Sequence, residues 1–201
     1  LINYGDPTNV FYCSYQNGSI DMTRNGGADY HSITASIGES GGWVTPYVLH
    51  PTDTATLLLG YKNVYLSIDN GDSWSPMSPI FDSDAYLNIL AIAPSNPNFV
   101  YTVHNDYNIW KSVINYTSNY GVSWDTIHIP FTNFISDLVV NPTNERKIWV
   151  TVSGYSSTDK VYQYNLTTDV WTNEGGTLPN LPVNCILIDT FSKSRYIGTD
   201  A

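Results

Sequence analysis

The sequence predicts an all-β protein built from a repeated unit of four short antiparallel strands. Two short signatures recur along the chain with a shared period of about 45 residues, which is typical of repeat architectures. Aromatic residues make up 14% of the chain, including 16 Tyr and 6 Trp, and these residue types favour strands. No segment shows the apolar periodicity of a convincing amphipathic helix.

Composition excludes several classes of protein. Only 13% of the 201 residues are charged, against about 25% in an ordinary soluble domain, and the net charge is −10. The aromatic content is too high for a disordered chain, and no apolar run approaches the roughly 20 residues that span a membrane. The 8 Lys and Arg residues are too few for a phosphate-binding stripe. We therefore expect a secreted or cell-surface protein with no nucleic-acid partner and no membrane insertion.

The first signature is a turn that follows an apolar, strand-like run and usually contains proline. Its four proline-containing copies are Asp6-Pro7-Thr8-Asn9, His50-Pro51-Thr52-Asp53, Ala93-Pro94-Ser95-Asn96 and Asn141-Pro142-Thr143-Asn144. A fifth copy without proline is Asp189-Thr190-Phe191-Ser192. The prolines are separated by 44, 43 and 48 residues.

The second signature is the run Ser67-Ile68-Asp69-Asn70-Gly71-Asp72-Ser73-Trp74. Similar runs end at Tyr30 and Trp124, and a shorter, less similar run ends at Trp171, so that the four aromatic residues are separated by 44, 50 and 47 residues. Since both signatures share one period, each marks the same place in a repeated unit. The equivalent residues are Thr23, Ser67 and Thr117, then Asn25, Asp69 and Asn119, then Gly27, Gly71 and Gly121, and finally Tyr30, Trp74, Trp124 and Trp171.

The two signatures divide residues 1–201, taken as a single domain segment, into repeat units. The units are approximately 1–43, 44–86, 87–134 and 135–184, with the start of a fifth at 185–201. In the third unit we expect strands over 87–93, 99–104, 108–114 and 123–129. Four strands per repeat of this length are typical of β-propeller blades. We expect about four blades of a propeller that is larger when complete, with edge strands exposed or covered by the remaining blades or another copy of the chain.

The pattern Ser-x-Asp-x-Gly-x-Ser-Trp resembles the Asp-box, or BNR repeat, of sialidase, xyloglucanase and sortilin-type propellers. Ser67–Trp74 matches every position. Thr117–Trp124 has Asn119 in the Asp position, Thr23–Tyr30 has Asn there and Tyr in place of Trp, and the fourth copy keeps little beyond Trp171. Secreted bacterial xyloglucanase-like propellers are the most similar. The resemblance implies a propeller whose boxes lie on the face away from the ligand.

The physical role expected of the box residues is structural. The glycines can adopt the positive φ that other residues resist, the Asp or Asn side chains can accept hydrogen bonds from turn amides, and the tryptophans can pack beneath the hairpin. A calcium loop of the EF-hand type needs a bidentate Glu, and no Glu follows Asp69 in this segment. We expect no metal site and no cofactor.

The sequence lacks a complete catalytic set for the enzymes of this family. A sialidase needs three converging arginines, but Arg24 and Arg146, two of the three in the chain, fall at non-equivalent positions of their units. A xyloglucanase-like hydrolase needs two carboxylates, and the positions that match its Thr-Asp-x-Gly-Gly stretch hold Gln16 and Lys62. Asp200 matches the beginning of that stretch and is the single catalytic candidate.

We therefore expect a non-catalytic binding or scaffold segment that recognises polysaccharide or protein. The alternative is part of a xyloglucanase-like glycoside hydrolase whose catalytic carboxylates lie partly outside this chain. Aromatic side chains on loops are the candidates for ligand contact, and we select Tyr86, Tyr107 and Tyr155. Cys13 and Cys185 fall in distant units and are expected to be reduced, buried thiols. The aromatic residues outside the boxes include Trp43, Tyr47, Tyr61, Tyr65, Tyr86, Tyr107, Trp110, Trp149 and Tyr155.

Overall fold

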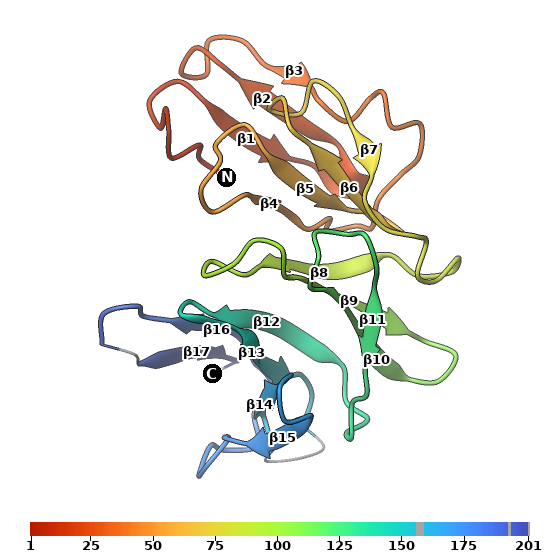
Figure 1. Cartoon of the computed structure of the whole chain (residues 1–201), viewed down its shortest axis with the longest axis vertical. Coiled ribbons are helices and arrows are strands. Elements are labelled where there is room, and N and C mark those ends of the chain that lie inside the picture. The colour runs from red at the N-terminus through yellow and green to blue at the C-terminus, as the bar shows by residue number, and fades with distance from the viewer. Residues whose placement is uncertain (156–158, 193, 201) are drawn as a thin grey trace.

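A computed structural model describes residues 1–155, 159–192 and 194–200. These residues form five antiparallel sheets that follow one another along the chain, from the red sheet at the top of Figure 1 to the blue sheet at its lower left. The helical element in this part of the chain is a short 3-10 turn, η1 (Gln16–Gly18). The predicted all-β fold with four-stranded antiparallel sheets is confirmed.

Within every sheet, consecutive strands pair with one another. The first sheet contains β1 (Phe11–Ser14), β2 (Ile20–Thr23) and β3 (His31–Ser32), and Ile2 forms an isolated bridge with Phe11. The second contains β4 (Tyr47–Leu49), β5 (Leu57–Gly60), β6 (Val64–Ser67) and β7 (Ser75–Pro76). The third contains β8 (Leu87–Ile92), β9 (Val100–Asp106), β10 (Lys111–Thr117) and β11 (Asp125–Ile127). The fourth contains β12 (Ile135–Asn141), β13 (Asn144–Val152), β14 (Val161–Asn165) and β15 (Val170–Asn173), and the fifth contains β16 (Val183–Ile188) and β17 (Arg195–Thr199).

One strand of the third sheet lies later in the chain than predicted. The pattern assigned 108–114 to a strand, whereas β10 begins three residues later. The cause is a turn, in which Asp106 Oδ1 accepts hydrogen bonds from the backbone amides of Asn108 at 2.8 Å and Ile109 at 3.3 Å. The next residue, Trp110, has a positive φ of 53° that is incompatible with a strand.

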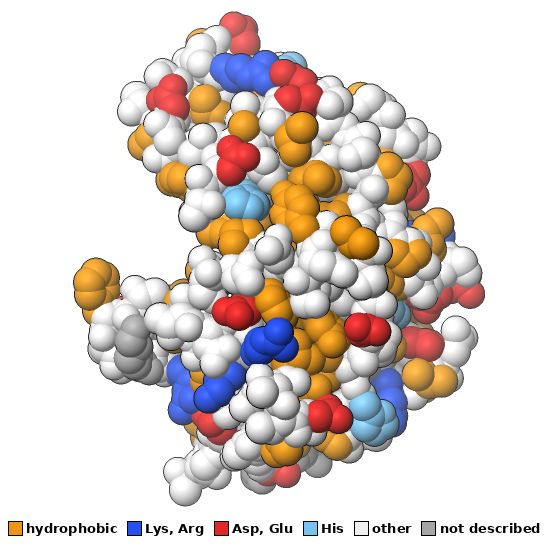
Figure 2. All heavy atoms as spheres, in the orientation of Figure 1, with side chains coloured by type: hydrophobic (Ala, Val, Ile, Leu, Met, Phe, Trp, Pro, Cys, Tyr) orange, Lys and Arg blue, Asp and Glu red, His pale blue; other side chains and the backbone are white. Residues whose placement is uncertain are grey.

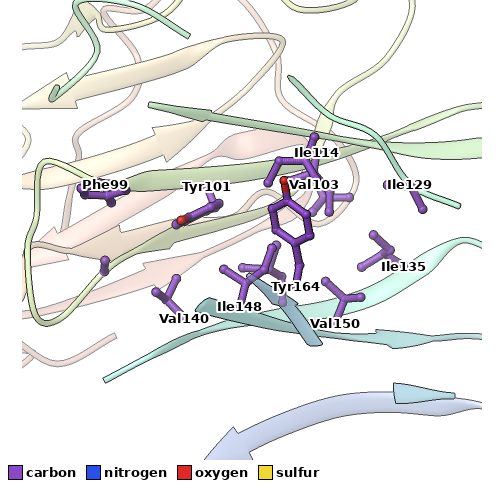
Figure 3. Close-up of a cluster of buried hydrophobic side chains, with 13 residues drawn as sticks. Phe99, Tyr101, Val103, Ile114, Ile129, Ile135, Val140, Ile148, Val150 and Tyr164 are labelled. Atoms are coloured by element: carbon purple, nitrogen blue, oxygen red, sulfur yellow. The ribbon is translucent and has the colours of Figure 1, made fainter. Parts of the chain in front are cut away.

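The hydrophobic cores lie between successive sheets. Between the third and fourth sheets, Tyr101, Val103 and Ile114 face Val140 and Ile148, and all five are buried (Figure 3). Burial of each aliphatic side chain contributes about 1.5–3 kcal/mol. Similar clusters join the first sheet to the second, the second to the third and the fourth to the fifth. Each sheet is therefore stabilised by its neighbours in the series.

The first strands of successive sheets contact one another, as they do around the axis of a propeller. β4 contacts β8, β8 contacts β12, and β12 contacts β16. β8, β12 and β16 each have an irregular register near their start. Such a bulge adds one unpaired residue and redirects its side chain. In β8 the register shift lies between Leu87 and Ile89, so the added residue is Asn88.

The cysteines are only partly as expected. Both are free, but the prediction that they are buried is wrong, because Cys185 is exposed and Cys13 is half-buried. Cys185 lies on β16, and the described chain packs another sheet on only one side of the β16–β17 sheet. Leu187 and Tyr196 of the same sheet are exposed for the same reason.

Candidate binding site

The strand connections fall on two opposite ends of the sheets, because antiparallel strands alternate in direction. One end, called the box end, holds the hairpins β2–β3, β6–β7, β10–β11 and β14–β15, which contain the four box sequences. The other end, called the rim end, holds the loops β1–β2, β5–β6, β9–β10 and β13–β14 together with the connections between successive sheets. The two ends present different side chains.

At the box end, hydrogen bonds within the hairpin satisfy the polar side chains. In the β6–β7 hairpin, Ser67 Oγ accepts from the amide of Gly71 at 2.8 Å and donates to Asp69 Oδ1 at 2.8 Å. Asp69 in turn accepts from the amide of Ser73 at 2.9 Å and from its hydroxyl at 2.5 Å. These bonds lower the pKa of Asp69, the Ser73 hydroxyl being the largest cause. The carboxylate is thus used to hold the turn.

The same bonding pattern recurs where asparagine replaces aspartate. Asn119 Oδ1 accepts from the amide of Ser123 at 2.9 Å, and Thr117 Oγ1 accepts from the amide of Gly121 at 2.9 Å. In the first sheet, Asn25 Oδ1 accepts from the amide of Asp29 at 3.0 Å. The amide oxygen of asparagine therefore performs the same task as a carboxylate oxygen in this turn.

Each box tryptophan also contacts the preceding sheet, which the sequence did not predict. Trp74 Nε1 donates to the carbonyl of Ile33 at 2.7 Å, and Trp124 Nε1 donates to the carbonyl of Met77 at 3.3 Å. Trp171 Nε1 makes the equivalent bond to the carbonyl of His128 at 2.8 Å. Tyr30 has no preceding sheet in the described chain, and its half-exposed ring contacts Phe11 of its own sheet instead.

The box glycines allow this close approach. Gly71 and Gly121 have φ values of 93° and 86°, where residues with a Cβ are strained. A Cβ at Gly71 would also lie 2.6 Å from the Ile33 side chain, and one at Gly121 would lie 2.7 Å from Met77. The box hairpins therefore pack closely against the sheets that precede them.

The rim end, in contrast, exposes aromatic side chains. Trp43 is 71% exposed and Trp110 is 68% exposed, although both belong to the residue type with the largest apolar surface. On the face of the molecule shown in Figure 2, the charged side chains form small groups, some of opposite sign in contact, among larger areas of uncharged surface. The exposed aromatic residues of the rim end are Tyr15, Trp43, Tyr86, Tyr107, Trp110 and Tyr155.

Three of these rings line one hollow of about 380 Å³, called the rim pocket. Trp43 comes from the connection before β4, Tyr86 from the connection before β8, and Tyr107 from the β9–β10 loop. Asn88 and Asn105 contribute amide groups, and Asp84 is the one carboxylate among the described residues that line it. The structure thus brings together the predicted candidates Tyr86 and Tyr107.

Hydrogen bonds fix the two asparagines of the rim pocket. Asn88 Oδ1 accepts from the backbone amide of Asn105 at 2.9 Å, and Asn105 Oδ1 accepts from the Ser112 hydroxyl at 2.6 Å. Ser112 Oγ is itself held by the amide of Ile135 at 2.8 Å. Because both Oδ1 atoms are used and neither Nδ2 group has a partner within the described residues, two N–H₂ groups remain as oriented donors.

Tyr86 has two close neighbours in the structure, Lys62 and Gly42. Lys62 Nζ lies 5.6 Å from the centre of its ring and donates a hydrogen bond to the carbonyl of Ser83. Gly42 also lies close to this tyrosine, since a Cβ at Gly42 would lie 3.2 Å from Tyr86 Cβ. Lys62, which stands where the family resemblance would place a carboxylate, therefore contacts the Tyr86 ring instead.

The other two predicted site residues do not line the rim pocket. Tyr155 is exposed on the β13–β14 loop, of which residues 156–158 lie outside the described residues, and its carbonyl accepts a bond from Asn180. Asp200 follows β17, and its Oδ1 accepts a bond from Asn184 Nδ2 at 2.7 Å. Among the described residues there is no cluster of three His, Cys, Asp or Glu side chains that could hold a metal, and no helix there is long and apolar enough to cross a membrane.

Comparison with known proteins identifies the fold. No family model matches the chain, and no curated protein sequence matches it. Among solved structures, the GH74 enzyme of Niastella koreensis is 15% identical, with a TM-score of 0.64 over 83% of this chain and 28% of that chain. YCF48 from Cyanidioschyzon merolae is 12% identical, with a TM-score of 0.65 over 95% of this chain and 63% of that chain. The chain has a β-propeller fold.

These likenesses show the fold alone, because every identity is low. A YCF48 structure with bound D1 peptide is also similar, at 12% identity and a TM-score of 0.61 over 90% of this chain and 55% of that chain. This chain therefore spans between about a quarter and two thirds of the length of these propeller proteins. No family model confirms the Asp-box repeats themselves, so the resemblance to Asp-box proteins stays a prediction from the sequence.

Proposed function

We propose that this chain is a non-catalytic binding segment of a secreted or cell-surface propeller, and that its rim pocket holds polysaccharide. The observation that carries the proposal is the meeting of Trp43, Tyr86 and Tyr107 with two oriented amide donors in one hollow. A sugar ring offers C–H groups on its faces and oxygen atoms around its edge. Exposed aromatic faces and fixed N–H donors are complementary to these two features.

The non-catalytic part of the proposal rests on the carboxylates. Hydrolysis of a glycosidic bond needs an acid and a second carboxylate about 5–10 Å apart. Asp84 is the one carboxylate among the described residues of the rim pocket, and Asp200 does not line it. The rival proposal is part of a glycoside hydrolase, favoured by the structural likeness to a GH74 enzyme, of which this chain spans 28%.

A glycan array followed by affinity measurements tests the proposal. We expect the protein to bind neutral polysaccharides, and Tyr107→Ala to weaken binding by about 1 kcal/mol, which is roughly fivefold. Tyr196→Ala is the matched control, because Tyr196 is similarly exposed (58% against 62%) but lies on β17, away from the rim pocket. Equal losses for the two variants, or no glycan binding at all, would refute the proposed site. Release of reducing sugar by this chain would establish the hydrolase instead.

A further inference from the structure

A second hollow lies on the other side of Trp43. It measures about 300 Å³ and is lined by Ser14, Tyr15 and Gln16 of the first sheet, together with Trp43, Val44 and Thr45. The rim pocket is also lined by Trp43 and Val44, so these two residues form a wall shared by both hollows. The two hollows therefore lie next to each other at Trp43, one against the first sheet and the other extending to Asn105 and Tyr107 of the third.

Hydrogen bonds and close packing hold the backbone turn that carries Trp43 and Val44. Thr45 Oγ1 donates to the carbonyl of Gly42 at 2.9 Å, and the amide of Gly41 donates to the carbonyl of Asn17 at 2.9 Å. A Cβ at Gly41 would lie 2.5 Å from Thr45 Oγ1 and 2.8 Å from the buried ring of Tyr61. This close packing fixes the backbone of the turn that carries Trp43, so that little backbone freedom is lost when a ligand stacks on the exposed indole.

The charges around the two hollows oppose an anionic ligand. The second hollow is lined by uncharged side chains, and the rim pocket contributes Asp84. The neighbouring cation, Lys62, is already held against Tyr86 and the Ser83 carbonyl. The whole chain carries a net charge of −10. A polyuronate would thus meet repulsion without a free positive partner.

We infer that the ligand is a neutral polysaccharide chain that crosses Trp43, with consecutive sugar units in the rim pocket and in the Ser14–Gln16 hollow. This inference rests on the proposed function and extends it from one pocket to an extended site on two sheets. Trp43 is then contacted on both sides and determines the preference for long chains over short ones. Gln16, which lines the second hollow, becomes a binding residue of that hollow.

The test is a titration with neutral oligosaccharides of increasing length, using cello-, xylo- and manno-oligomers, with oligogalacturonates as the anionic comparison. For wild type we expect affinity to rise with length until both hollows are filled, and to be lower for the uronates. Trp43→Ala should remove most of this rise, lowering affinity for the longest oligomer roughly fivefold or more. Gln16→Ala should weaken only the oligomers that reach the second hollow.

Tyr196→Ala is again the control, because Tyr196 is an exposed aromatic residue (58% against 71% for Trp43) that lies on β17 and lines neither hollow. It should leave the length dependence unchanged. If Trp43→Ala weakens short and long oligomers equally, or if affinity does not depend on length, the extended site is refuted while the rim pocket stands. If no neutral oligosaccharide binds and an array of uncharged peptides does, the proposed function fails and this inference fails with it.

Discussion

The contact between Trp74 and the preceding sheet can be tested by truncation. Trp74→Ala removes the hydrogen bond to the carbonyl of buried Ile33 and a ring that packs against the core between the first two sheets. Truncation of a tryptophan in a core costs about 3–5 kcal/mol. Because the Trp74 ring is half-buried, we expect the lower end, a loss of about 3 kcal/mol in the free energy of unfolding. Trp74→Phe keeps most of the ring and should cost about 1 kcal/mol through the lost hydrogen bond.

Tyr30→Ala is the matched control for this prediction. Tyr30 occupies the same position in its hairpin, but no described sheet precedes it, and its half-exposed ring contacts Phe11 at 6.0 Å. Its truncation should cost about 1 kcal/mol or less. Urea unfolding of the four proteins measures these differences, provided that the slope with denaturant is unchanged. If Tyr30→Ala costs as much as Trp74→Ala, the contact with the preceding sheet is not the source of the stabilisation.

Three further predictions concern the stability of single positions. Hydrogen bonds lower the pKa of Asp69 in the folded protein from 3.8. Their contribution to the free energy of unfolding is therefore present above about pH 4 and is lost as the pH falls through the folded pKa. Asp69→Asn should retain the turn, and its melting curves should lack this acid dependence. Burial lowers the folded pKa of His104, whose Nδ1 has no partner in the described chain. The unfolded imidazole then binds a proton first, so stability falls below about pH 6.5, and the melting temperature of His104→Gln should fall less between pH 7 and pH 5 than that of wild type. Gly121→Ala should destabilise more than Gly38→Ala in thermal melts, because both glycines have positive φ but only a Cβ at Gly121 meets a neighbour, at 2.7 Å.

The sequence was sufficient to predict the turns because turn geometry depends on local residues. A hydroxyl, an Asp or Asn two residues later and a glycine two residues after that define a hairpin wherever they occur, and Ser67, Asp69 and Gly71 form one. The partners of the box tryptophans could not be predicted in this way. Their acceptors are backbone carbonyls of Ile33, Met77 and His128, which share no residue type and therefore give no signal in the sequence.

The candidate site was predictable in part for a related reason. Tyr86 and Tyr107 were selected because they lie on loops, which is a local property. Trp43 was one of many aromatic residues outside the boxes, and only the fold shows that it separates two hollows. The amide of Asn88 reaches the rim pocket through a β-bulge, and such a register shift depends on pairing with β9 rather than on the residues of β8 alone.

The central claim is that the rim end binds ligand and the box end stabilises the fold. It is tested most directly by measuring two quantities for each of two variants: the glycan affinity by calorimetric titration, and the melting temperature. Tyr86→Ala changes the rim pocket, and Asp69→Ala changes a box hairpin. We predict that Tyr86→Ala weakens binding and leaves the melting temperature nearly unchanged. Asp69→Ala should lower the melting temperature, at a cost of about 1 kcal/mol, and leave the affinity of the folded protein unchanged. If Asp69→Ala abolishes binding without affecting stability, the box end is a functional site and the account is wrong.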